Sequence, residues 1–209
     1  MPLAQRMHLG ALAAITGGAL WLLIWVLYFL IHGPGPDDRQ GYILTLTHYD
    51  YSKFMVVPLA LFAVALTGLH SRQRGRSRRL TATGYVLALI ALVVTAIGVA
   101  LSLWPIPWGV YTVDWEAPLP MWGGLLSSLS TFALALGLFV FGIGTWRAGV
   151  WPSWVALALI VGALSIVPWL HMTIFGWIFS AAWLLPGYAL WSATSEQHAV
   201  GSRDRLETR

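Results

Sequence analysis

The chain has 209 residues, of which 58% are hydrophobic and only 10% are charged, and its mean hydropathy is +0.72. Soluble domains carry roughly 25% charged residues, so this composition excludes a water-covered globule and predicts an integral membrane protein. The chain has no cysteine, which excludes disulfides, thiolate catalysis and cysteine-ligated metals. The formal net charge of +4 comes from arginines near predicted helix ends, which favours contact with anionic lipid headgroups over nucleic acid.

Six apolar segments alternate with polar or proline-rich connections, and most of them are close to the ~20 residues that span a bilayer. The first is too long for the ~7–15-residue core of a signal peptide, so we expect it to be retained. Pro58 lies in the first turns of the second, where a missing backbone donor costs least. Just before it, Lys53 is expected to extend towards the outer headgroups. The predicted spans cover residues of about 8–31, 49–70, 80–103, 123–146, 153–170 and 173–191.

The loop between the second and third spans sets the orientation. Residues 71–79 carry five arginines and no acid, and short basic loops stay on the cytoplasmic side. With this loop inside, ten of the twelve Lys and Arg residues fall on the cytoplasmic side. The prediction is therefore an all-α bundle of six transmembrane helices in the cell membrane, with both termini cytoplasmic. The polar tail 192–209 is expected to be disordered.

The connection between the third and fourth spans, residues 104–122, has an unusual composition. It holds four tryptophans, four prolines and two acids, which is too interrupted for a transmembrane helix and too apolar for free exposure to water. We expect it to lie on the outer end of the bundle as a lid. No Asp, Glu, Lys or Arg lies in the middle of a predicted span, which disfavours ion-coupled transport.

Histidines and acids gather on the predicted outer face. The candidates for acid–base catalysis are His48, Asp50, Asp114, Glu116 and His171. Four of the five also have a simpler interpretation: Asp50 suits a helix cap, His171 a tight turn, and Asp114 and Glu116 an ordinary loop. A carboxylate under the apolar lid would have a raised pKa and suit proton donation. Their spacing matches no established metal motif.

No cofactor or metal is expected. The one pair of histidines near the inner ends of the spans is His8 with His70. Both lie at the membrane boundary, where anchoring is the ordinary role, so the pair gives little support for haem ligation.

Nine of the thirteen tryptophans fall at the predicted membrane interfaces, which is typical of aromatic belts. The other four lie deeper: Trp21, Trp25, Trp177 and Trp183. These either pack between helices, which is favoured, or line a pocket for a flat or cationic apolar ligand. The candidates for ligand binding are Trp115, Trp122 and Trp177.

Three functions remain open. The leading hypothesis is a non-enzymatic bundle, either an accessory subunit of a larger membrane complex or a binding protein for a lipid or another apolar ligand. The second is an interfacial membrane enzyme that acts on a lipid or isoprenoid from the outer face by acid–base chemistry. The third is a transporter or channel without an ionisable site at membrane depth. The expected partners are the lipid bilayer and a membrane protein or second copy of the chain, and not nucleic acid.

Overall fold

The computed structural model describes residues 3–32, 50, 53–75, 79–106, 117–166 and 173–207, without the side chains of 28–32, 173–175 and 196–207. This part of the chain contains six helices and no strand, which confirms the all-α prediction. The helices are α1 (Leu3–His32), α3 (Val56–Gln73), α4 (Arg79–Leu103), α5 (Pro118–Ala148), α6 (Ser153–Ser165) and α7 (Thr173–Glu207).

Three of these helices are long and apolar enough to cross a membrane. They are α1 over Leu3–Leu27, α4 and α5, with mean hydropathies of 2.0, 2.8 and 2.0 in their most apolar windows. A helix of 25 residues is about 38 Å long at 1.5 Å per residue, which exceeds the ~30 Å hydrocarbon core of a bilayer. Large apolar side chains such as Ile90 and Leu129 are exposed on their outward faces. Together these features indicate a membrane protein.

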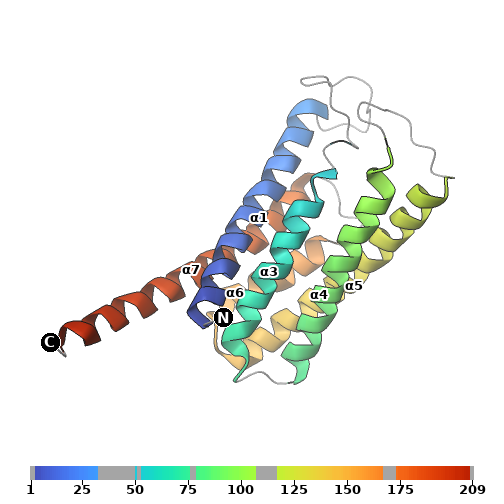
Figure 1. Ribbon diagram of the computed structural model, residues 1–209. Coiled ribbons are helices and arrows are strands. Elements are labelled where there is room, and N and C mark those ends of the chain that lie inside the picture. The colour runs from blue at the N-terminus through green and yellow to red at the C-terminus, as the bar shows by residue number, and fades with distance from the viewer. Residues whose placement is uncertain are drawn as a thin grey trace.

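The helices form two neighbouring groups (Figure 1). Helix α1 packs against both α3 and α7, whereas α4 packs along the whole length of α5. Helix α6 joins the groups because it contacts both α5 and α7, and α3 contacts α4. The space between the groups is therefore bounded by α1 and α3 on one side and by α4 and α5 on the other.

Helices α4 and α5 approach so closely that only glycine fits at several contacts. A Cβ atom added to Gly84 would lie 2.4 Å from the backbone nitrogen of Phe141, and one added to Gly137 would lie 2.5 Å from that of Ala88. Small residues allow two helix backbones to approach in this way where no hydrophobic force drives association. These glycines therefore set the distance between α4 and α5.

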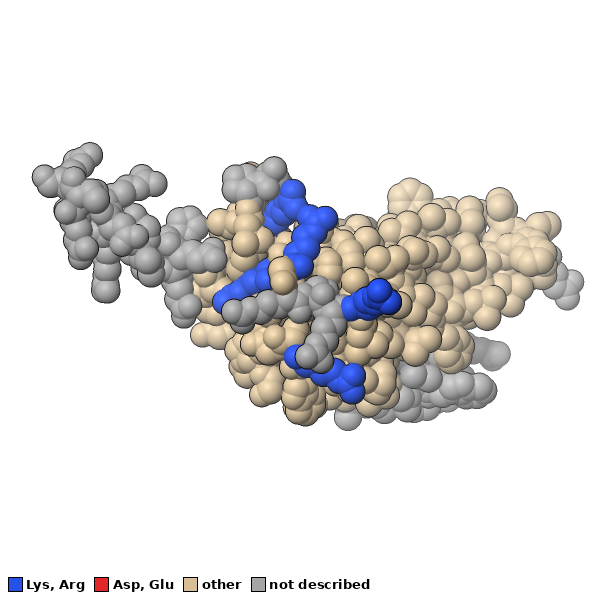
Figure 2. Space-filling view, turned by 90° about the horizontal axis from the view of Figure 1, so that it is seen from below, with Lys and Arg blue, Asp and Glu red and all other residues tan. Residues whose placement is uncertain are grey.

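Arginines collect at one end of the bundle, which we call the arginine end. Figure 2 shows this end with Lys and Arg side chains spread across it. The N-terminal part of α1 lies there beside α7, since the ring of His8 is 5.1 Å from that of Trp191. The described arginines of this end lie near the starts of α1 and α4 and near the ends of α3 and α5; they are Arg6, Arg72, Arg74, Arg79 and Arg147.

Two helices extend beyond the predicted spans. Helix α5 begins at Pro118, five residues before the expected start at 123, because proline is well tolerated at the first position of a helix. Helix α7 continues to Glu207, through the segment 192–207 in which we expected disorder. Propagating an existing helix adds one hydrogen bond per residue fixed, and no proline follows Pro186 to stop it.

Candidate functional site

At the arginine end, buried polar contacts tie α3 to α5 and to the turn after it. The side-chain nitrogen of Gln73 donates to the hydroxyl of Thr145 at 3.1 Å, and both residues are 0% exposed. The indole nitrogen of Trp151 donates to the carbonyl of Leu69 at 3.4 Å. The guanidinium carbon of Arg72 lies 4.4 Å from the centroid of the Trp151 ring, a cation–π contact. These contacts fix the spacing of the two helix groups at this end.

At the opposite end, Lys53 corrects the sequence prediction. Its ammonium donates to the carbonyl of Ile106 at 2.7 Å and lies 3.4 Å from a carboxylate oxygen of Asp50. Lys53 is only 5% exposed and Asp50 0%, so the lysine does not extend to the headgroups. A charge-assisted hydrogen bond and a nearby carboxylate offset the cost of removing the ammonium from water. Asp50, which we gave as a catalytic candidate or a helix cap, lies in this ion pair.

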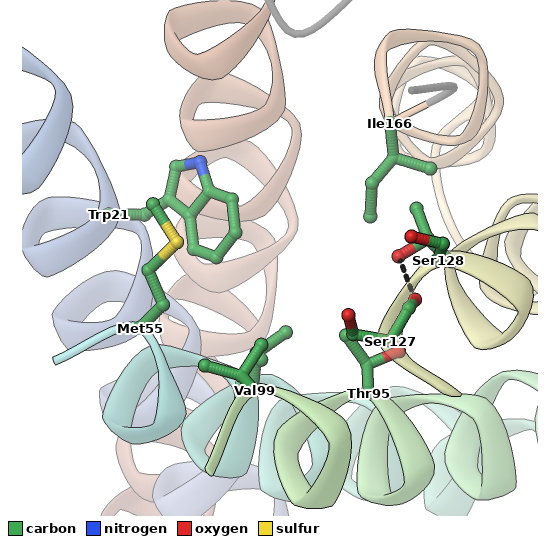
Figure 3. A pocket seen from close by; sticks show the side chains of 9 residues that line it. Trp21, Met55, Thr95, Val99, Ser127, Ser128 and Ile166 are labelled. Carbon is green, nitrogen blue, oxygen red and sulfur yellow. Dashed lines mark hydrogen bonds between the residues drawn. The ribbon is translucent and has the colours of Figure 1, made fainter. Parts of the chain in front are cut away.

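Between these two ends, the described helices form a partly open cavity of about 230 Å³. This exceeds the roughly 150 Å³ that accommodates a benzene molecule in an engineered protein cavity. Figure 3 shows Trp21 and Met55 on one side and Thr95, Ser127 and Ser128 on the other. The cavity is lined by Trp21 from α1, Met55 and Leu59 at the start of α3, Thr95 and Val99 from α4, Ser127, Ser128 and Thr131 from α5, and Ile166 after α6.

An aromatic cluster holds the apolar side of the cavity in place. Trp21 is 7% exposed, and its ring lies 5.1 Å from that of Phe179 and 5.9 Å from that of Phe62. Phe62 in turn stacks on Trp183 at 4.4 Å. Because four large rings from α1, α3 and α7 pack together, the indole has little freedom to turn, and the apolar wall is formed before any ligand arrives.

The opposite side is a hydroxyl wall, consisting of Thr95, Ser127, Ser128 and Thr131. Three of its hydroxyls donate to carbonyls one turn back on their own helix. Thr95 donates to Ala91 at 2.8 Å, Ser127 to Gly124 at 3.0 Å and Thr131 to Ser127 at 2.7 Å. A hydroxyl has one hydrogen and two lone pairs, so each of these oxygens can still accept a hydrogen bond.

A contact between the helices fixes this wall. The hydroxyl oxygens of Thr95 and Ser130 are 2.8 Å apart, which joins α4 to α5 directly behind the cavity. The glycines of the same helix pair bring the backbones close enough for this short contact. The hydroxyl wall is therefore as rigid as the aromatic wall that it faces.

Three of the eight predicted site residues lie in the described part of the chain, and none of the three lines the cavity. Asp50 lies in the ion pair with Lys53. Trp122 is 62% exposed and Trp177 41% exposed, and neither lines the cavity. The remaining candidates, His48, Asp114, Trp115, Glu116 and His171, lie outside the described residues.

Sequence reasoning missed the hydroxyl wall, although a signal for it was present. Residues 127–131 read Ser-Ser-Leu-Ser-Thr inside an apolar span, and hydroxyl residues at membrane depth commonly bond to neighbouring helices. Trp21 was one of the four deep tryptophans, and it lines the cavity, whereas Trp183 packs behind it.

The two histidines near the arginine end face separate partners. His8 lies against Trp191, and His70 stacks on Tyr85 with ring centroids 4.2 Å apart. Among the residues that the structure describes, no three His, Asp or Glu side chains lie close enough to hold a metal ion. The cavity between the two helix groups is a separate candidate site, which contains neither of these histidines.

Comparison of the chain with family models, with curated proteins and with solved structures gives no match. The function is therefore inferred from the chemistry of the cavity and from the helices around it.

Proposed function

We propose that the protein is a multi-pass membrane protein that binds a small, largely apolar ligand inside its helical bundle. The observation that carries this proposal is the cavity between the aromatic cluster and the hydroxyl wall. Both walls are held by contacts that do not depend on a ligand. Preformed apolar pockets with a few fixed polar groups are the usual form of small-molecule sites.

The lining favours binding over catalysis. None of the nine lining residues is an Asp, Glu, His, Lys or Arg. General acid–base chemistry needs a titratable group within hydrogen-bond reach of the reacting atom, and the cavity offers only hydroxyls. An interfacial enzyme acting through the outer-face residues remains the alternative. It predicts that changes at Asp114 or Glu116 abolish turnover of a lipid substrate while leaving ligand binding in the cavity intact.

The proposed topology has six spans with both termini cytoplasmic. It is supported by the arginine end, because the start of α1 and the region of α7 around Trp191 lie beside each other there. Single cysteines in place of Ser77 and Thr112 should react from opposite sides of sealed vesicles. Reaction of both from the same side would overturn this topology.

Ligand binding can be tested with p-menthane, a ten-carbon ring hydrocarbon without polar groups. Protein in lipid nanodiscs should show a saturable rise in its unfolding temperature, since a ligand at 100 times its Kd stabilises by about 2.7 kcal/mol. Val99→Phe places a ring in the cavity and should abolish the rise.

The matched control is Val86→Phe. Val86 lies on the same helix α4 but is 49% exposed on the outer surface, so this variant keeps the response of the unchanged protein. If the unchanged protein and Val99→Phe respond equally, the hydrocarbon acts through the bilayer and the proposal fails.

A further inference from the structure

We infer that the ligand of this cavity is a neutral alcohol, with an apolar body against the aromatic cluster and a hydroxyl group that donates to the hydroxyl wall. This inference rests on the proposed function and specifies the chemistry of the same site. It follows from three properties of the lining: its charge, its hydrogen-bonding capacity and its size.

The charge of the lining excludes an ionic ligand. None of the nine lining residues has a charged side chain. An ion buried there would lose its hydration without gaining a partner of opposite charge, which is energetically costly. In α3 and the described residues just before it, the charged side chain nearest to the lining residues in the sequence is that of Lys53. Its ammonium already contacts Asp50 and the Ile106 carbonyl. A neutral ligand is therefore required.

The hydrogen bonds of the hydroxyl wall leave acceptors facing the ligand. The hydroxyl of Thr95 is shared between the Ala91 carbonyl and the Ser130 hydroxyl, whereas Ser127 and Thr131 each direct their hydroxyl hydrogen to a backbone carbonyl. Their remaining lone pairs can bond only to a donor, which an alcohol supplies and a ketone or ether does not. Ser128 is the exposed member of the wall, and its hydroxyl can donate to the ligand oxygen in return.

The aromatic wall supplies no competing donor. The indole nitrogen of Trp21 is buried and has no hydrogen-bond partner in the described part of the chain. This atom has almost no accessible surface, so packed atoms separate it from the open volume. The ring of Trp21 therefore contributes apolar surface to the cavity.

The volume limits the ligand to a small molecule. At about 230 Å³ the cavity is below the ~300–1,000 Å³ of typical drug-sized sites. A two-chain lipid cannot enter as a whole, whereas a compact alcohol with a ring or a short branched body can.

Menthol, menthone and p-menthane test the inference because they share one carbon skeleton. Menthol has a hydroxyl, menthone a carbonyl in its place, and p-menthane neither. Their dissociation constants for the protein in lipid nanodiscs follow from the dependence of the unfolding temperature on ligand concentration. We expect menthol to bind roughly three- to tenfold more tightly than menthone, the effect of one hydrogen bond.

Thr131→Val removes one acceptor without changing the volume of the side chain and should reduce the preference for menthol; adding Ser127→Ala should abolish it. The matched control is Thr67→Val. Thr67 donates to the Ala63 carbonyl at 2.8 Å, the same one-turn bond as that of Thr131, but it is exposed on α3 and lies outside the cavity. This variant should keep the full preference.

The two proposals fail in different ways. If all three compounds bind equally and Val99→Phe abolishes their binding, the cavity is a ligand site but the alcohol inference is wrong. The inference is equally wrong if menthone binds as tightly as menthol, or if the double variant keeps the preference. If no compound stabilises the unchanged protein more than it stabilises Val99→Phe, the proposed function itself is wrong.

Discussion

Replacing Gly84 by alanine should force apart the two most closely packed helices of the bundle. The added Cβ would lie 2.4 Å from the backbone nitrogen of Phe141 and 2.7 Å from its Cα, whereas ordinary contacts are 3.4–4 Å. Backbone atoms cannot relieve the clash by changing rotamer, so α4 and α5 would have to separate by about 1 Å. This separation would remove about a quarter to a half of the dispersion energy of each contact between the two helices.

The magnitude follows from two opposing effects. Overpacking of this kind costs about 1–3 kcal/mol, and a clash with backbone belongs at the upper end of that range. Alanine favours a helix over glycine by about 1 kcal/mol. We therefore expect a net loss of about 2 kcal/mol in the free energy of unfolding, or roughly 4–8 °C in Tm at 2–4 °C per kcal/mol.

The assay is thermal unfolding in mild detergent, with the folded fraction measured by size-exclusion chromatography after each heating step. The matched control is Gly75→Ala, because no atom of the described residues lies within 4 Å of a Cβ added at Gly75. The Tm of this variant should remain that of the unchanged protein. An unchanged Tm for Gly84→Ala would refute the close contact between α4 and α5.

Three further changes test single contacts. Lys53→Met removes the ammonium beside the buried Asp50 carboxylate and should cost about 3–5 kcal/mol in denaturant titrations, with much of the loss restored by adding Asp50→Asn; a Lys53→Met variant as stable as the unchanged protein would contradict the buried pair. Gln73→Leu and Thr145→Val should show a coupling of about 1 kcal/mol in a double-mutant cycle, whereas additive effects would argue against their hydrogen bond. Gly149→Ala should lower the free energy of unfolding by about 1–2 kcal/mol, because the backbone of Gly149 has φ = 62°. Thermal unfolding measures this loss, and an unchanged Tm would mean that the turn has another conformation.

The sequence could predict the features of this protein that depend on local composition. Apolar runs of helical length, ended by glycine, proline or arginine, were enough to predict an all-α membrane protein, because a bilayer accepts a backbone only when its hydrogen bonds are satisfied within the segment. The glycines of α5 are equally visible in the sequence, although only the structure shows that they contact α4. Small residues allow helix backbones to approach closely wherever two membrane helices meet.

The burial of Lys53 against the Ile106 carbonyl could not be predicted from the residues around it in the chain. From the sequence, a lysine near the end of a predicted span is expected to extend to the lipid headgroups. In the structure it is held by the Ile106 carbonyl, 53 residues away, together with Asp50. Whether an ammonium is buried depends also on acceptors from distant parts of the chain, such as the Ile106 carbonyl, and these have no local signature.

The cavity likewise depended on tertiary structure alone. Its lining comes from α1, α4 and α5 as well as from the start of α3 and the end of α6. The helices that cross a membrane are apolar on every face, so their periodicity does not indicate which side of each helix faces a neighbour. For this reason the sequence predicted that Trp21 and Trp177 lie on apolar helices, while only helix packing decided that Trp21 lines the cavity and Trp177 faces outward.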